Sequence, residues 1–185
     1  REVLPVARRE QDGVALGGAA VQKLILHFCC GDHAGGLPFA DETARHIAGL
    51  SGTPNLQLYH MINALSRVCA APGDRVTARA VRQSVALHRK WAEAAPTNYA
   101  APYELIQGVW MRARGDRRRA EQHLARAIAL AEQHQLPLIS GLAHEEAGAL
   151  HAQAGRAAAS RAMIRTAHLR WVGMGMAVRS DRLER

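Results

Sequence analysis

The sequence predicts an all-helical protein made of about four helical hairpins and a short capping helix. The composition is one reason: 48% of the residues are apolar but only 4% are aromatic, and small apolar side chains let helices pack closely. The second reason is a repeated glycine corner. It occurs at Gly31-Asp32, Gly73-Asp74, Gly115-Asp116 and Gly155-Arg156, at intervals of 42, 42 and 40 residues. A constant period of this length is typical of stacked helical hairpins.

Proline residues predict where several helices begin. Pro54, Pro102 and Pro137 each precede an apolar-periodic segment, as expected in a first helical turn, where the missing N–H costs little. Thr53 is the predicted N-cap before Pro54, and Pro96 is expected to end the helix that precedes it. The predicted hairpins pair 15–32 with 37–50, 54–71 with 75–95, 99–114 with 117–135, and 137–154 with 157–172.

The remaining segments complete the expected organisation. Residues 1–13 are interpreted as the remnant of a preceding helix or a linker, 14–173 as the repeat domain, and 174–185 as a C-terminal capping helix. The run Gly35-Gly36-Leu37-Pro38 predicts a late start for the second helix of the first hairpin. The chain begins Arg-Glu-Val without a methionine or a signal-like charge pattern, and we expect it to be part of a longer protein.

The last two predicted hairpins share a pattern of small and branched residues. Gly108 and Gly148 both lie seven residues before a corner, and Leu124 and Ile164 both lie nine residues after one. We expect the small residues to let the two helices cross and the branched residue to fill the space between neighbouring hairpins. This pattern resembles the tetratricopeptide repeat, although the period exceeds the 34 residues usual for it. The resemblance implies a right-handed α-solenoid.

A second resemblance is carried by a series of short motifs. They are Trp91 to Asn98, Tyr103-Glu104-Leu105, Gly115-Asp116, Arg126 to Ala131, Leu142 to Glu145, and Leu169-Arg170-Trp171. In this order they resemble the helical region of large bacterial signalling ATPases, which join a kinase-like domain, an ATPase domain and often a sensor histidine kinase. The resemblance covers about 20–184. It departs at Trp171-Val172-Gly173-Met174, where that family usually has tryptophan, glycine and alanine. Trp91, Trp110 and Trp171 are expected to pack in the core.

The sequence contains no recognisable catalytic motif. It has no G-x-x-x-x-G-K-[ST] loop for phosphate and no H-R-D or D-F-G of a kinase. His144-Glu145-Glu146 begins like a zinc-protease motif, but Gly148 stands where the second histidine is needed, and His151 adds only one further ligand. We therefore expect no catalytic residue, no cofactor and no metal. The odd number of cysteines, with Cys29 and Cys30 adjacent, favours a reducing cytoplasm over a disulfide framework.

The expected partner is a protein or peptide. In tetratricopeptide-like arrays the first helix of each hairpin lines a concave groove, and the residues placed there are Asn63, Arg67, Leu105, Val109, Arg112 and Glu145. Asn63, Arg67 and Arg112 could hold a peptide backbone or a carboxylate; alternatively, the groove is filled by a neighbouring domain of the parent protein. The net charge of +8 comes from scattered arginines, so nucleic acid is not the expected partner. Gln22, Lys23 and His27 interrupt the most apolar stretch, so no membrane association is expected.

The leading hypothesis is a non-catalytic interaction domain that couples signals in a cytoplasmic bacterial signalling ATPase or kinase regulator. An autonomous peptide-binding adaptor is the second hypothesis. The third is the inducer-sensing segment of a transcription activator. An upstream phosphate loop would favour the first, an independent start codon the second, and a C-terminal helix-turn-helix the third.

Overall fold

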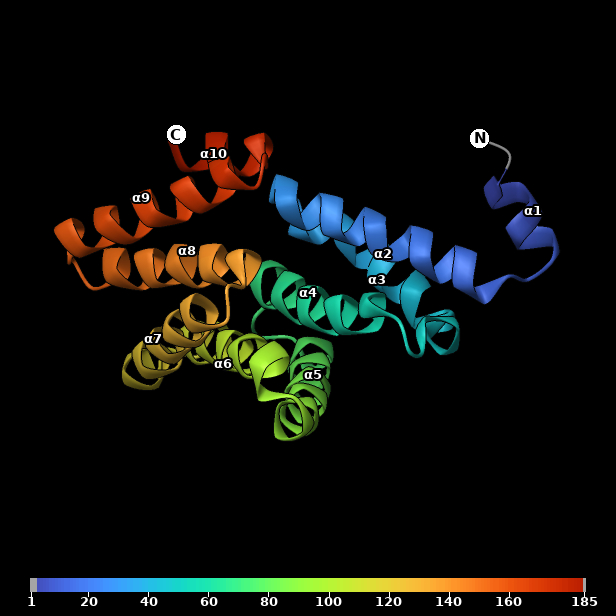
Figure 1. The fold of residues 1–185 in the computed structure, drawn as a ribbon, viewed down its shortest axis with the longest axis horizontal. Helices are drawn as coiled ribbons and strands as arrows, with labels where there is room; N and C mark the ends of the chain where they lie inside the picture. Colours follow the sequence, from blue (N-terminus) through green and yellow to red (C-terminus); the bar gives the residue numbers. More distant parts are fainter. Residues whose placement is uncertain (1–2, 185) are drawn as a thin grey trace. The chain divides into compact units, whose positions relative to one another are not determined.

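The computed structural model of the protein describes residues 3–184, and within that range it contains helices and turns but no strand (Figure 1). The prediction of an all-helical fold is confirmed. The chain divides into two compact units, Arg1–Ala80 and Val81–Arg185, which we call unit 1 and unit 2 and describe separately. The predicted boundaries at residues 13 and 173 stay predictions.

Unit 1 contains α1 (Val3–Arg9), α2 (Gly13–Cys30), α3 (His33–Arg45), the short 3-10 helix η1 (Ile47–Leu50), α4 (Pro54–Ala70) and the beginning of α5 (Arg75–Ala94). The rest of α5 belongs to unit 2, which continues with α6 (Pro96–Ala113), α7 (Arg117–Gln133), α8 (Pro137–Gln153), α9 (Ala157–Gly173) and α10 (Ala177–Glu184). The terminal helix expected near 176–184 is therefore present.

The second helix of the first hairpin starts earlier than predicted. α3 begins at His33, because the Asp32 side chain accepts a hydrogen bond from the amide of Gly35 (2.9 Å) and caps the helix. A Cβ atom at Gly35 would collide with that carboxylate, so this glycine permits the cap and does not break the helix. The capping bond from Gly35, followed by the His27 hydrogen bond, also lowers the pKa of Asp32.

One proline prediction and one capping prediction are also corrected. α6 begins at Pro96, which occupies the first turn, whereas Pro102 lies inside the helix and is buried. Pro96 does end the preceding helix, so it serves both functions. Thr53 occupies the N-cap position of α4, but its hydroxyl donates to the carbonyl of Leu50 (2.7 Å) and makes no capping bond.

α2 is long and apolar enough to cross a membrane by length and composition, and it is the one such helix among the described residues. The expectation that the chain has no such segment is therefore not met. One face of α2 packs against α3, α4 and η1. Its buried residues are Leu16, Gly17, Ala20, Val21, Leu24 and Phe28.

The helices of unit 2 are joined by nearly identical corners. The three helices α7, α8 and α9 each have 17 residues, and a residue with positive φ follows each helix from α6 to α9 at steps of 20 positions. These residues are Gly115, Gln135, Gly155 and Gly175, with φ values of 78°, 54°, 70° and 69°. At each corner the next amide donates to a carbonyl five residues earlier, which is the Schellman closure of a helix end.

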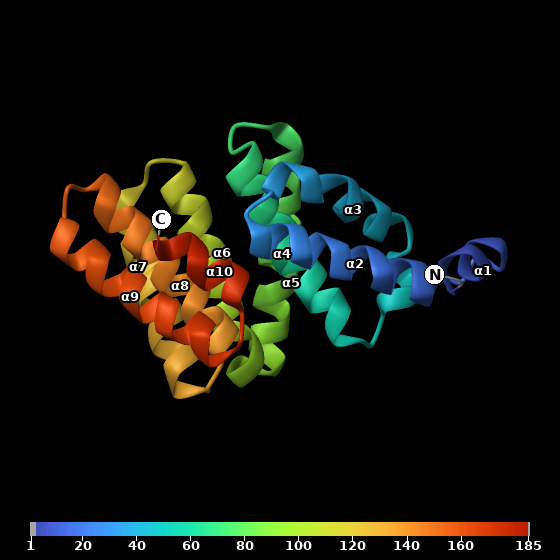
Figure 2. The same ribbon diagram turned by 90° about the horizontal axis from the view of Figure 1, so that it is seen from above.

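Consecutive helices of unit 2 from α6 to α10 contact each other in sequence order. Figures 1 and 2 show this for α8 and α9, which lie side by side and are joined at the corner that contains Gly155. α6 also contacts α8, its neighbour but one. Gly73, at the second predicted corner, does not have a positive φ, so that corner is built differently.

The aligned residues of the last two hairpins meet within each hairpin. A Cβ atom at Gly108 would lie 2.7 Å from Leu124, and one at Gly148 would lie 2.7 Å from Ile164. The second pair, Gly148 and Ile164, stands 40 positions after the first pair, Gly108 and Leu124. The prediction of close helix crossing at glycine is confirmed, and the branched residue of each pair meets the glycine of its own hairpin.

The three tryptophans differ in burial. Trp171 is fully buried and packs on Gly141, as predicted for a core residue. Trp91 is half-buried, with ring contacts to His88 and Tyr99. Trp110 is also half-buried, so the prediction of a core position is only partly met there.

Candidate functional site

Two of the predicted groove residues belong to a hydrogen-bonded chain on α4. Arg67 Nε donates to Asn63 Oδ1 (2.8 Å), and the Asn63 amide lies 3.4 Å from the hydroxyl of Tyr59. Arg67 also forms an ion pair with Asp41 of α3. Tyr59, Asn63 and Arg67 stand four positions apart on one face of α4, which is why their side chains can meet. Burial raises the pKa of Tyr59. This series of side chains, which ends in the ion pair of Arg67 with Asp41, therefore connects α4 to α3 within unit 1.

The other predicted groove residues lie on α6 and α8 in unit 2. Leu105 and Val109 are buried, so their side chains are not exposed to a partner in the structure. Arg112 donates to Glu146 (2.9 Å), and Glu145 accepts from Arg179 of α10 (2.9 Å). Burial raises the pKa of Glu146, and the neighbouring Arg112 opposes that rise. These two ion pairs connect α6 to α8 and α8 to α10.

The predicted polar cluster of Asn63, Arg67 and Arg112 thus consists of side chains that already have partners. Asn63 and Arg67 are bonded to each other in unit 1, and Arg112 is paired in unit 2. A glutamate at position 112 would face the carboxylate of Glu146, so a charge reversal there would perturb folding before it could report on binding. The assignment of these residues to a partner-binding groove stays a prediction.

A surface pocket of about 290 Å³ lies between α5 and α6 within unit 2. We call it the Trp110 pocket. Its lining residues are Val81, Arg82, Val85, Ala86, Arg89, Tyr103, Gln107, Trp110 and Met111. Tyr103, Gln107 and Trp110 follow one another at steps of four and three along α6, and Arg82, Val85 and Arg89 do so at steps of three and four along α5, so each helix presents one face.

The polar groups of the Trp110 pocket are only partly paired. Gln107 donates to the hydroxyl of Tyr103 (3.3 Å), and Arg89 lies 3.6 Å from Glu93, where both side chains are exposed. Arg82 has no ion-pair partner among residues 3–184. The guanidinium of Arg114 stands over the ring of Trp110, 5.6 Å from its centroid. This pocket was not predicted from the sequence, because Trp110 was expected in the core. The helical spacing of Tyr103, Gln107 and Trp110 was the available signal.

Residues 3–184 contain no group of three histidine, cysteine, aspartate or glutamate side chains arranged to hold a metal ion. His144, which begins the zinc-protease-like motif, is buried and donates from Nδ1 to the carbonyl of Ser140 (2.8 Å). Ser140 in turn bonds Glu132, which also accepts from Arg170 (2.6 Å). These hydrogen bonds, that of Ser140 first, lower the pKa of Glu132. This network joins α7, α8 and α9 and has a packing role.

The fold and these sites define an all-helical protein with a surface pocket of aromatic, apolar and arginine side chains. Comparisons of the chain with protein-family models, with curated proteins and with solved structures found no match.

His60 on α4 makes unit 1 sensitive to acid. Burial lowers its pKa from 6.5 to about 4, so the unfolded chain takes up a proton at a higher pH than the folded chain does. The free energy of unfolding is therefore unaffected by His60 above pH 6.5. It falls by up to about 3 kcal/mol as the pH approaches 4, because His60 in the unfolded chain takes up a proton. We expect His60→Gln to remove this loss, as measured by urea unfolding between these pH values. The same pH dependence in both proteins would contradict the assignment.

Proposed function

We propose that the chain is a non-catalytic protein-interaction domain that recognises a peptide or protein segment through the Trp110 pocket. The observation that carries this proposal is the composition of the pocket. Tryptophan, tyrosine, methionine and arginine are the residues enriched where proteins bind one another. In the Trp110 pocket they surround an apolar surface, and Arg82 is left without a counter-charge among residues 3–184.

We further propose that unit 2 is part of a right-handed α-solenoid of the tetratricopeptide-like kind. The uniform helices and the corners at steps of 20 residues support a repeated unit. The ion pairs support it too, since those of Arg112 and Arg179 connect the even-numbered helices, while Glu132 and Arg170 connect α7 with α9. Alternate helices joined in this way form two layers, as they do in helical repeats.

The parent protein is proposed to be a cytoplasmic bacterial signalling ATPase or kinase regulator, in which this domain couples a bound partner to the other domains. The support is the series of motifs from Trp91 to Trp171. In an autonomous adaptor the same pocket would act alone. In a signalling ATPase the occupant of the pocket would be a neighbouring domain of the same protein or a separate polypeptide. In an adaptor it would be a separate polypeptide.

The test is a selection of random displayed peptides on the purified chain. Because Arg82 and Arg89 flank apolar and aromatic side chains, we expect enrichment of acidic peptides that carry a large apolar residue. Arg82→Glu and Trp110→Ala should each weaken these peptides about tenfold or more, because truncating a buried interface anchor costs on the order of 2 kcal/mol. Affinities would be measured by isothermal titration calorimetry.

Arg118→Glu is the matched control, because Arg118 is an exposed arginine outside the pocket, on α7. It should leave peptide affinity unchanged. Far-UV circular dichroism would verify that every variant keeps its helicity. The proposal fails if no peptide is enriched, or if the selected peptides bind the Arg82→Glu and Trp110→Ala variants as well as the original chain.

A further inference from the structure

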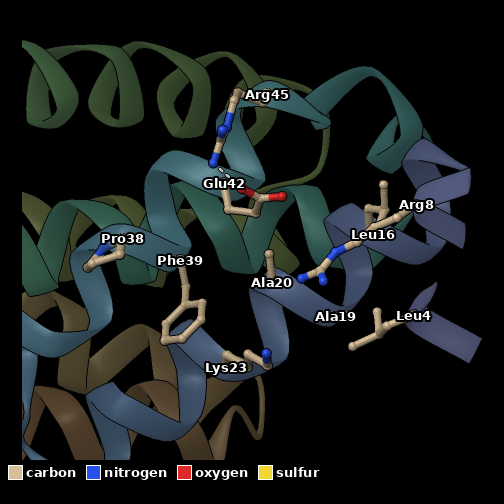
Figure 3. A pocket seen from close by; sticks show the side chains of 10 residues that line it. All are labelled: Leu4, Arg8, Leu16, Ala19, Ala20, Lys23, Pro38, Phe39, Glu42 and Arg45. Carbon is tan, nitrogen blue, oxygen red and sulfur yellow. Dashed lines mark hydrogen bonds and ion pairs between the residues drawn. The ribbon is translucent and has the colours of Figure 1, made fainter. Parts of the chain in front are cut away.

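A second pocket lies in unit 1, among α1, α2 and α3, and has a volume of about 270 Å³ (Figure 3). Its apolar lining residues are Leu4, Leu16, Ala19, Ala20, Pro38 and Phe39. Because α2 presents alanines here, its backbone lies close to the pocket and leaves room beside Phe39 of α3. The volume lies just below the range of pockets that hold drug-sized molecules, so the pocket suits a small ligand.

Two cationic side chains converge on this space. In Figure 3, Arg8 extends from α1 and Lys23 from α2 toward the same region beside Ala19 and Ala20. The ammonium group of Lys23 also stands 5.2 Å from the centroid of the Phe39 ring. Neither Arg8 nor Lys23 has a carboxylate partner among residues 3–184. Both side chains are cationic, so an anion bound beside them would meet two positive charges.

The remaining charges of the pocket are already compensated. Arg45 forms an ion pair with Glu42, drawn at the far side of the pocket in Figure 3. Glu42 also lies 3.3 Å from the ring nitrogen of His46. The carboxylate of Glu42 thus pairs with Arg45 and His46, and the charged lining residues Arg8, Lys23, Arg45 and Glu42 leave a net positive charge above an apolar floor.

We propose that this pocket binds a small aliphatic carboxylate. The hydrocarbon part would lie on Leu16, Ala19 and Phe39, and removing it from water is favourable. The carboxylate would accept hydrogen bonds from Arg8 and Lys23, which charge makes stronger than neutral ones. An inorganic anion would leave the apolar floor uncovered, and an aliphatic cation would add to the existing positive charge. The proposal is independent of the Trp110 pocket.

The test uses sodium octanoate with the full chain labelled with ¹⁵N. We expect saturable chemical-shift changes that are confined to the amides of residues lining the pocket. Arg8→Gln combined with Lys23→Gln should raise the dissociation constant about tenfold or more, since both ionic partners of the carboxylate are lost. Both side chains are exposed, so the fold should be retained, and the spectrum itself reports on that.

The matched control is Arg9→Gln combined with Lys90→Gln, which removes the same charges from exposed positions outside the pocket. It should bind octanoate as the original chain does. Octylammonium and inorganic phosphate should cause no saturable shift at these amides. The proposal is overturned if octanoate causes none either, if octylammonium or phosphate binds as well as octanoate, or if the control pair weakens octanoate as much as the pocket pair.

Discussion

Replacing Trp171 by alanine should destabilise the protein by about 3–5 kcal/mol, the usual cost of removing a large buried aromatic side chain. Trp171 is fully buried at the end of α9 and packs against Gly141 of α8. Urea unfolding followed by circular dichroism would measure the loss. Trp171→Phe is the matched variant and should cost clearly less. It keeps much of the apolar volume and removes an indole N–H that has no acceptor among residues 3–184.

A double-mutant cycle tests the contact itself. A Cβ atom at Gly141 would lie 2.7 Å from the Trp171 ring, so Gly141→Ala alone should cost about 1–3 kcal/mol through overpacking. Once Trp171 is alanine, the same change should become stabilising, since alanine favours a helix over glycine by about 1 kcal/mol. The double variant reproduces the buried pair Ala101 and Ala131, which stand 40 positions earlier. Additive costs would show that the two residues are not coupled.

Arg112→Met should destabilise the protein by about 3 kcal/mol at pH 7, because it leaves the half-buried carboxylate of Glu146 without its partner. Burial already raises the pKa of Glu146, and loss of Arg112 should raise it further. A raised pKa means that the folded state holds the proton more tightly than the unfolded state does. The destabilisation should therefore shrink as the pH falls and Glu146 becomes neutral. Urea unfolding at several pH values would measure this.

Two further variants distinguish a buried ion pair from an ordinary surface one. Arg112→Met combined with Glu146→Leu should come within about 1 kcal/mol of the original protein, because no charge is left buried. Arg156→Met is the matched control. Arg156 pairs with Glu121 at 2.9 Å, but the two side chains are 42% and 45% exposed, so the loss should stay below about 1 kcal/mol. Equal losses for Arg112→Met and Arg156→Met would contradict the role given to burial.

Local features of the chain were the most predictable from sequence. The glycine corners at 115 and 155 and the helices on either side were expected, because a left-handed residue and the hydrogen bonds that close a helix end involve only neighbouring residues. Gln135 completes the series of corners without being a glycine, so a search for glycine alone could not find it. Gly35 was misinterpreted because its role depends on the capping side chain of Asp32 three residues earlier.

The candidate site was much less predictable. Arg112 and Glu146 stand 34 positions apart, and no local pattern indicates that they meet. Trp110 was expected in the core because a large aromatic on a helix is usually buried, yet it lines an open pocket. Lys23 interrupts an apolar stretch in the sequence, and only the fold shows that it faces the same space as Arg8.

The sequence by itself determined the helices, their order and most of their corners, since backbone hydrogen bonding and glycine geometry act over a few residues. The tertiary structure alone decided which charges are paired and which remain open. It also decided that Trp171 is covered by a neighbouring helix while Trp110 is not. Burial and ion pairing depend on side chains brought together from distant positions, so they follow from packing and not from local sequence.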